Sequence, residues 1–218
     1  TVYIVLVGTV LVKYDNEVVE LGKGMSFGEF AFVDAQMRRS ADVWGGENDA
    51  FVIAITKENM QKLMAQCPEV EAAIMNIQRN VVYLEKLATD ENSIFSQLPL
   101  SVLFELAAKC RIKTIARGEM ILRKNELIAD KGAYIIKKGQ IEVIVSARKS
   151  KVFGLGTMFG EGAFFNPEGR RNASVKAYTD VELLEIRGKD FIEALNNSSK
   201  LNRAVFEMYA KRFEENAV

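Results

Sequence analysis

Histidine is absent from the 218 residues of this sequence. Imidazole is the usual general base near neutral pH, the commonest metal ligand, and a member of Ser-His-Asp and Cys-His catalytic groups. Its absence removes these classes of enzyme. We therefore expect a protein without catalytic activity and without a metal site.

Cysteine is scarce, since Cys67 and Cys110 are the only two in the sequence. They stand far apart, in segments with helical patterns, so neither a disulfide framework nor a CxxC metal site is indicated. We expect both to be small buried hydrophobic side chains in a reducing compartment.

The sequence also lacks net charge and long apolar runs. Lys plus Arg equals Asp plus Glu at 29 each, so no general field attracts nucleic acid or an anionic membrane. No segment approaches the roughly 18 apolar residues of a membrane span, and no signal peptide is visible. We expect no nucleic-acid partner, no membrane span and a cytoplasmic location. The sequence opens inside an apolar run, Val2 to Val7, which predicts a fragment of a longer protein.

What the sequence does contain is an internal repeat. Three blocks align in the same order: residues 3–10 with 134–141, 25–32 with 157–164, and 38–43 with 170–175. The offset between aligned positions stays at 131 or 132 residues. Agreement of order, spacing and residue type across three blocks indicates an internal duplication.

Each copy changes from strand-like to helix-like patterning. In each copy the last short β-branched run lies at residues 50–55 or 181–186. Apolar residues then recur at spacings of three and four residues, as in a helix. Pro68 stands where a second helix would begin. The polar stretch Thr89 to Ser93 marks a junction. We predict an α+β fold of two tandem β-roll (jelly-roll-like) domains, each followed by a helix pair: residues 1–90, N-terminally truncated, and residues 91–218.

One block in each copy carries the chemistry. The segments FGEFAF…RRSAD and FGEGAFF…RRNAS both read Phe-Gly-Glu-x-Ala, a short insert, then Arg-x-Ala. This doubled pattern resembles the phosphate-binding cassette of cyclic-nucleotide-binding domains, and the resemblance covers nearly the whole chain. It implies cyclic AMP or cyclic GMP as a regulatory ligand, with no cofactor.

The residue types suit a cyclic phosphate. A glycine turn brings backbone N–H groups close to an anion, and a guanidinium supplies charge-assisted hydrogen bonds. Counting back from the Ala of Arg-x-Ala assigns this role to Arg39 and Arg171. The family's commonest insert length, counted from the Glu, would select Arg38 and Arg170 instead. The resemblance implies that the cassette Glu binds the ribose 2′-hydroxyl.

The expected ligand-binding residues are Gly28, Glu29, Phe30, Ala31, Arg39, Ser40 and Ala41 in the first copy and Gly160, Glu161, Gly162, Ala163, Arg171, Asn172 and Ala173 in the second. Gly162 stands where the family has an aliphatic residue. Ser40 and Asn172 follow the Arg, at the position where the resemblance implies a contact with the guanine amino group in guanine-preferring members. Both side chains can accept a hydrogen bond from that group, which predicts that both nucleotides bind. Candidate base caps on the helices are Tyr83, Tyr209 and Phe213, with core packing as the alternative.

Two functions remain. The first is a regulatory sensor similar to the regulatory part of cyclic-nucleotide-dependent protein kinases, which implies a kinase catalytic subunit or domain as partner. The second is an interaction scaffold that keeps the fold without binding nucleotide. Both copies retain the Glu and the Arg, which favours the sensor.

Overall fold

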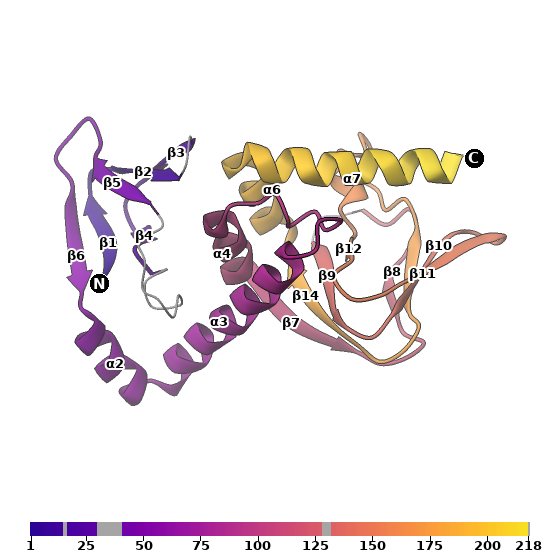
Figure 1. Ribbon diagram of the computed structural model, residues 1–218, viewed down its shortest axis with the longest axis horizontal. Helices are drawn as coiled ribbons and strands as arrows, with labels where there is room; N and C mark the ends of the chain where they lie inside the picture. Colours follow the sequence, from indigo (N-terminus) through magenta and orange to yellow (C-terminus); the bar gives the residue numbers. More distant parts are fainter. Residues whose placement is uncertain (15–16, 30–40, 128–131, 218) are drawn as a thin grey trace. The chain divides into compact units, whose positions relative to one another are not determined.

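The computed structural model describes residues 1–14, 17–29, 41–127 and 132–217. Contacts between these residues divide the chain into two compact units, Thr1–Val82 and Tyr83–Val218. In each unit, strands are followed by two helices (Figure 1).

The described strands of the first unit form two antiparallel sheets of three strands each, ordered β4-β1-β6 and β3-β2-β5. Val5, Val10 and Val12 form its buried core. The strands are β1 (Val2–Val7), β2 (Val10–Tyr14), β3 (Glu17–Leu21), β4 (Ser26–Phe27), β5 (Asp42–Gly45) and β6 (Phe51–Ile55).

The second unit holds two antiparallel sheets of four strands, ordered β11-β10-β13-β8 and β12-β9-β14-β7. Their facing sides enclose a core in which Tyr134, Ile136 and Leu183 are fully buried. The strands are β7 (Cys110–Ile115), β8 (Met120–Leu122), β9 (Ala133–Lys138), β10 (Ile141–Ser146), β11 (Lys149–Phe153), β12 (Met158–Phe159), β13 (Ser174–Ala177) and β14 (Val181–Ile186).

Gly8 and Gly139 show that the repeat in the sequence is a repeat in space. Both have positive φ, +74° and +81°. A Cβ on Gly8 would lie 2.3 Å from the Asp49 carbonyl oxygen, and a Cβ on Gly139 would lie 2.2 Å from that of Asp180. Only glycine satisfies both the conformation and the close approach. The same turn therefore joins β1 to β2 and β9 to β10.

The two units differ at the edges of their sheets. In the second unit β8 pairs with β13, and β7 pairs with β14. The corresponding strands of the first unit, β5 and β6, have no such neighbour among the described strands. Phe51 and Ile53 of β6 are accordingly 65% and 45% exposed. In the described residues, only the second unit has two complete four-stranded sheets around its site.

Helices follow the strands in both units. Thr56 accepts a hydrogen bond from the Asn59 backbone N–H and so caps the first of them. The helices are α2 (Lys57–Gln66), α3 (Pro68–Ala88), α4 (Leu100–Lys109), α5 (Gly162–Phe165), α6 (Gly188–Asn197) and α7 (Ser199–Ala217). Figure 1 shows α7 running along the roll of the second unit, where it packs against α5. Within the described ranges, no helix is long and apolar enough to cross a membrane.

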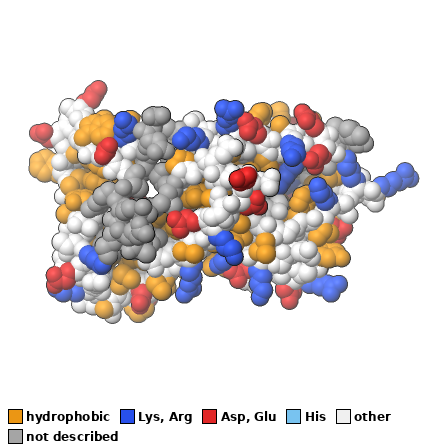
Figure 2. Space-filling model, in the orientation of Figure 1, with side chains coloured by type: hydrophobic (Ala, Val, Ile, Leu, Met, Phe, Trp, Pro, Cys, Tyr) orange, Lys and Arg blue, Asp and Glu red, His pale blue; other side chains and the backbone are white. Residues whose placement is uncertain are grey.

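The predicted elements are present, with one correction. Cys110 is not in a helix but is the first residue of β7. It is buried, and burial raises the pKa of its thiol to about 12. Cys67 ends α2 and is also a free cysteine. On the face drawn in Figure 2, basic and acidic side chains lie interleaved.

Candidate functional site

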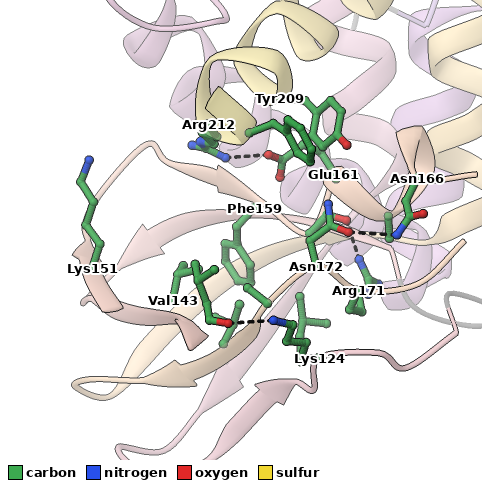
Figure 3. Close-up of a pocket in the computed structure, with 18 of the residues that line it drawn as sticks. Lys124, Val143, Lys151, Phe159, Glu161, Asn166, Arg171, Asn172, Tyr209 and Arg212 are labelled. Carbon is green, nitrogen blue, oxygen red and sulfur yellow. Dashed lines mark hydrogen bonds and ion pairs between the residues drawn. The ribbon is translucent and has the colours of Figure 1, made fainter. Parts of the chain in front are cut away.

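A pocket of about 650 Å³ lies in the second unit, walled by the roll and by α7 (Figure 3). Pockets that hold small ligands typically measure roughly 300–1,000 Å³. All the residues predicted for the second site line it: Gly160, Glu161, Gly162, Ala163, Arg171, Asn172, Ala173, Tyr209 and Phe213. The structure thus brings the second cassette and the two C-terminal candidate caps together around one cavity.

Arg171 is a buried cation in the pocket wall, with 2% of the residue exposed. Its Nη1 donates to the Gly160 carbonyl, and its Nη2 donates to the Gly132 carbonyl at 3.0 Å. Burial lowers the pKa of Arg171, while the nearby Tyr134, Glu126 and Glu161 raise it. A guanidinium stays charged in proteins, so the wall carries a fixed positive charge that suits an anion.

Gly160 makes this approach possible. Its φ is +85°, and a Cβ there would lie 3.1 Å from Arg171 Nη1 and 3.2 Å from the Gly132 carbonyl oxygen. A side chain would therefore be strained by the backbone and would crowd the guanidinium. The position of the arginine that ends the cassette therefore depends on the glycine that begins it.

The neighbouring Arg170 also borders the pocket but is bound elsewhere. Its Nη1 donates to the Asn125 carbonyl at 2.8 Å, and its Nε lies 3.7 Å from a Glu168 carboxylate oxygen. The two arginines of the cassette are thus distinguished by burial and by their hydrogen-bond partners.

Glu161 is buried and is paired with Arg212 of α7. Arg212 Nη1 donates to Glu161 Oε1 at 2.8 Å and to the Met158 carbonyl at 2.8 Å. Sequence reasoning did not select Arg212 as a site residue. The available signal was a basic residue three positions after Tyr209, on the helix face that carries the candidate caps.

Tyr209 covers the short cassette helix. Its ring stacks on Phe165 with centroids 5.3 Å apart, and a Cβ on Gly162 would lie 3.3 Å from the Tyr209 ring. Phe213, one turn further along α7, lines the pocket and is 61% exposed. An aromatic ring and an exposed aromatic edge are therefore available where a flat base would stack.

Strand β11 fastens the far end of α7. Lys149 Nζ donates to the Glu215 carbonyl at 2.9 Å, and Lys151 Nζ lies 3.8 Å from a Glu215 carboxylate oxygen. The Arg212 guanidinium lies over the Phe153 ring at 5.6 Å. Alternate residues of a strand share a face, so one face of β11 holds α7 over the pocket.

Asn172 is engaged in a way that the sequence did not suggest. Its Oδ1 accepts a hydrogen bond from Asn166 Nδ2 at 3.0 Å (Figure 3). One of the two acceptor positions of the predicted oxygen is therefore used by a neighbouring side chain. Asn166 itself, from the insert of the cassette, was not among the predicted residues.

The first cassette is described only at its ends. Phe30, Ala31, Arg38, Arg39 and Ser40 lie outside the described residues. Gly28 has φ of +80°, like Gly160 in the second cassette. Burial raises the pKa of the Glu29 carboxyl, and Ala41 packs against the core of the first unit.

Tyr83, the candidate cap of the first copy with packing as its alternative, belongs to the second unit and bonds to one of its strands. Its hydroxyl donates to the Ile136 carbonyl at 2.5 Å, and burial raises its pKa. A phenol prefers a partner for its O–H when buried, and β9 supplies that partner.

Part of the second unit matches a known family model. Residues 112–198 match the family model described as "Cyclic nucleotide-binding domain". The mouse cyclic nucleotide-gated channel alpha-4 is 31% identical over 110 residues, which are 47% of this chain and 19% of the channel. The chain thus spans less than a fifth of that relative's length.

Solved structures match over the whole chain. The structure "cAMP bound PfPKA-R (141-441)" has a TM-score of 0.71 at 20% identity and covers 100% of this chain and 74% of that one. The structure of the regulatory domain of Toxoplasma gondii PKA with cAMP has a TM-score of 0.55 at 23% identity. That match covers 98% of this chain and 78% of the other one. These likenesses confirm the α+β fold of two β-rolls with helix pairs. Residues 112–198, which include the second cassette, therefore resemble the cyclic nucleotide-binding domain family.

Proposed function

We propose that this chain is a cyclic-nucleotide sensor that regulates a protein kinase and has no catalytic activity of its own. The observation that carries the proposal is Arg171, a buried guanidinium fixed by two carbonyls at the wall of a pocket that also holds Glu161. A cyclic phosphate carries one negative charge, which this guanidinium can meet with charge-assisted hydrogen bonds. Glu161 is an acceptor for a ribose hydroxyl.

The contacts of α7 suggest how binding is transmitted. Glu161 already accepts from Arg212, so a hydroxyl that bonds to Glu161 acts on the residue that holds α7. A base stacked beside Tyr209 and Phe213 would add contacts to the same helix. A ligand with different affinities for two positions of α7 shifts the population between them.

The wider assignments rest on the same likeness. The similar structures include a regulatory domain of PKA, which supports a kinase catalytic subunit or domain as partner. A cytoplasmic location remains part of the proposal. The matching residues at Gly28 and Glu29 support a second nucleotide site in the first cassette. We place the domain boundary at residue 90, in the polar junction that follows α3.

The scaffold alternative is not favoured. A domain that kept only the fold would not need a guanidinium in the wall of an open pocket, because taking a charge out of water costs free energy. Here the cassette keeps its glycine, its glutamate and its arginine around one pocket, with Arg171 bonded to the Gly160 carbonyl.

Cyclic AMP or cyclic GMP is expected to raise the melting temperature of the protein. A ligand that binds only the folded state at about 100 times its Kd adds about 2.7 kcal/mol to the free energy of unfolding. For a chain of this size the shift is roughly 5 to 10 °C. Differential scanning fluorimetry with each nucleotide, and with adenosine as a ligand without phosphate, measures it. Absence of any shift at millimolar cyclic nucleotide would support the scaffold instead.

Replacing Arg212 by Met is expected to loosen α7. The variant removes the hydrogen bonds to Glu161 and the Met158 carbonyl but keeps an apolar stem. Hydrogen bonds to charged groups contribute about 1.5–3 kcal/mol, so amides of α7 should exchange about tenfold faster or more. Arg203→Met is the matched control, because Arg203 forms an exposed pair with Glu207 on the same helix. Equal exchange rates in both variants would show that Arg212 does not hold α7.

A further inference from the structure

The amide of Asn166 has only one orientation that satisfies its neighbours. Its Oδ1 accepts from the Glu168 backbone N–H at 3.0 Å, and its Nδ2 donates to the Arg170 carbonyl at 3.0 Å. The reversed amide would set an N–H against an N–H and an oxygen against an oxygen. The backbone of the cassette insert therefore fixes which end of Asn166 is the donor.

This orientation determines that of Asn172. Asn166 Nδ2 also donates to Asn172 Oδ1 at 3.0 Å, so the Asn172 oxygen faces Asn166. The amide nitrogen of Asn172 therefore faces away from Asn166. Asn172 Nδ2 lies 2.9 Å from the place where a Cβ on Gly162 would be, and the Tyr209 ring lies 3.3 Å from the same place. The amide thus borders the pocket beside the ring that covers it.

The three residues form a set that occurs only in the second cassette. The first cassette has Phe30, Asp34 and Ser40 at the positions that correspond to Gly162, Asn166 and Asn172. The glycine leaves room for the Asn172 amide, and Asp34 lacks the N–H that Asn166 uses. The two cassettes therefore differ in the hydrogen bonds available to the side chain that follows the cassette arginine.

We propose that Asn166 is a positioning residue that makes Asn172 a hydrogen-bond donor in the second site. The site then selects against a base whose amino group faces the Asn172 amide. The proposal rests on the proposed function, with the base lying against Tyr209. A donor that faces an amino group leaves both unsatisfied, whereas a ring nitrogen or carbonyl accepts from it. Guanine, with its 2-amino group, is then a poorer ligand than hypoxanthine.

Cyclic GMP and cyclic IMP test this directly, because they differ only in the 2-amino group. The protein used is the full chain with Arg39→Ala, which removes the proposed cation of the first cassette. Calorimetric titration is expected to show tighter binding of cyclic IMP, by about tenfold at most. In Asn166→Asp the carboxylate still accepts from the Glu168 N–H but attracts the Asn172 amide, so the Asn172 oxygen turns to the pocket. The affinity ratio should then shift by about tenfold toward cyclic GMP.

The ratio of the affinities for cyclic GMP and cyclic IMP distinguishes a role of Asn166 in orienting Asn172 from a general structural effect. The added charge of Asn166→Asp weakens both nucleotides alike and cancels in the ratio. In an Asn172→Ala background the same substitution should leave the ratio unchanged, which closes a double-mutant cycle. An unchanged ratio in Asn166→Asp, or a shift that persists without Asn172, overturns the proposal. If neither nucleotide binds the parent protein, the proposed function itself fails.

Discussion

Arg171→Ala is expected to lower the affinity of the second site for cyclic nucleotide by about a hundredfold or more. Arg171 is buried, and its guanidinium is held in place by the Gly160 and Gly132 carbonyls before any ligand arrives. Its removal leaves the phosphate charge without a partner in the pocket wall. A loss of about 3 kcal/mol is typical for a charged hydrogen-bonding partner in such a site. Titration of the full chain in an Arg39→Ala background measures the second site alone.

Arg170→Ala is the matched control, because the two arginines are adjacent in the cassette. Arg170 is bound to the Asn125 carbonyl and lies near Glu168 at the exposed rim, so its loss should change the affinity about threefold or less. A larger loss in Arg170→Ala than in Arg171→Ala would move the phosphate contact to the first arginine of the pair.

Much of the fold followed from the sequence because the repeat constrains it twice. The β-branched runs, the glycine turns and the helical periodicity recur in both copies, and Gly8 and Gly139 both have positive φ and a close approach to an Asp carbonyl oxygen. The start of α3 at Pro68 followed from the preference of proline for a first helical turn. The exception was Cys110, where an apolar helix passes directly into a strand with no turn residue to mark the boundary.

The site was predictable only where the cassette is continuous in sequence. Gly160, Glu161 and Arg171 follow from a pattern within about a dozen residues, since glycine, carboxylate and guanidinium are chemically suited to a phosphate and a ribose. Arg212 and Gly132 reach the same site from other elements, through contacts that no local pattern encodes.

Asn166 and Tyr83 show a second limit of sequence reasoning. The side chain of Asn166 is oriented by two backbone groups of a turn, and hence the role of Asn172 depended on a geometry that residue types alone do not specify. Tyr83 was a candidate cap with core packing as the alternative, and no local pattern indicated that its hydroxyl donates to the Ile136 carbonyl, which also accepts from the Gly156 N–H.

Gly132→Ala is expected to destabilise the second unit more than any other conservative substitution near the site. A Cβ at this position would lie 1.3 Å from the Ile186 carbonyl oxygen and 2.4 Å from the Ile186 carbonyl carbon. Backbone atoms cannot rotate away as a side chain can, so β9 and β14, which pair at Ala133 and Ile186, must separate locally. We expect a loss of at least about 3 kcal/mol and a fall of roughly 6 to 12 °C in Tm.

Gly154→Ala is the matched control for this substitution. Gly154 lies in the turn between β11 and β12, and a Cβ there would meet no heavy atom within 4 Å. The change should alter the free energy of unfolding by no more than about 0.5 kcal/mol. Thermal unfolding of the two variants side by side measures the contrast, and equal melting temperatures would contradict it.

Gly132→Ala should also weaken nucleotide binding under conditions where the protein is still folded. Moving the Gly132 carbonyl removes the acceptor of Arg171 Nη2 but leaves the bond from Nη1 to Gly160, so the guanidinium loses one of its two supports. At a temperature well below its Tm, Gly132→Ala should therefore bind cyclic nucleotide more weakly than the wild type, by about tenfold, and more tightly than Arg171→Ala. Wild-type affinity in a folded but destabilised Gly132→Ala would show that the Gly132 carbonyl does not position the arginine.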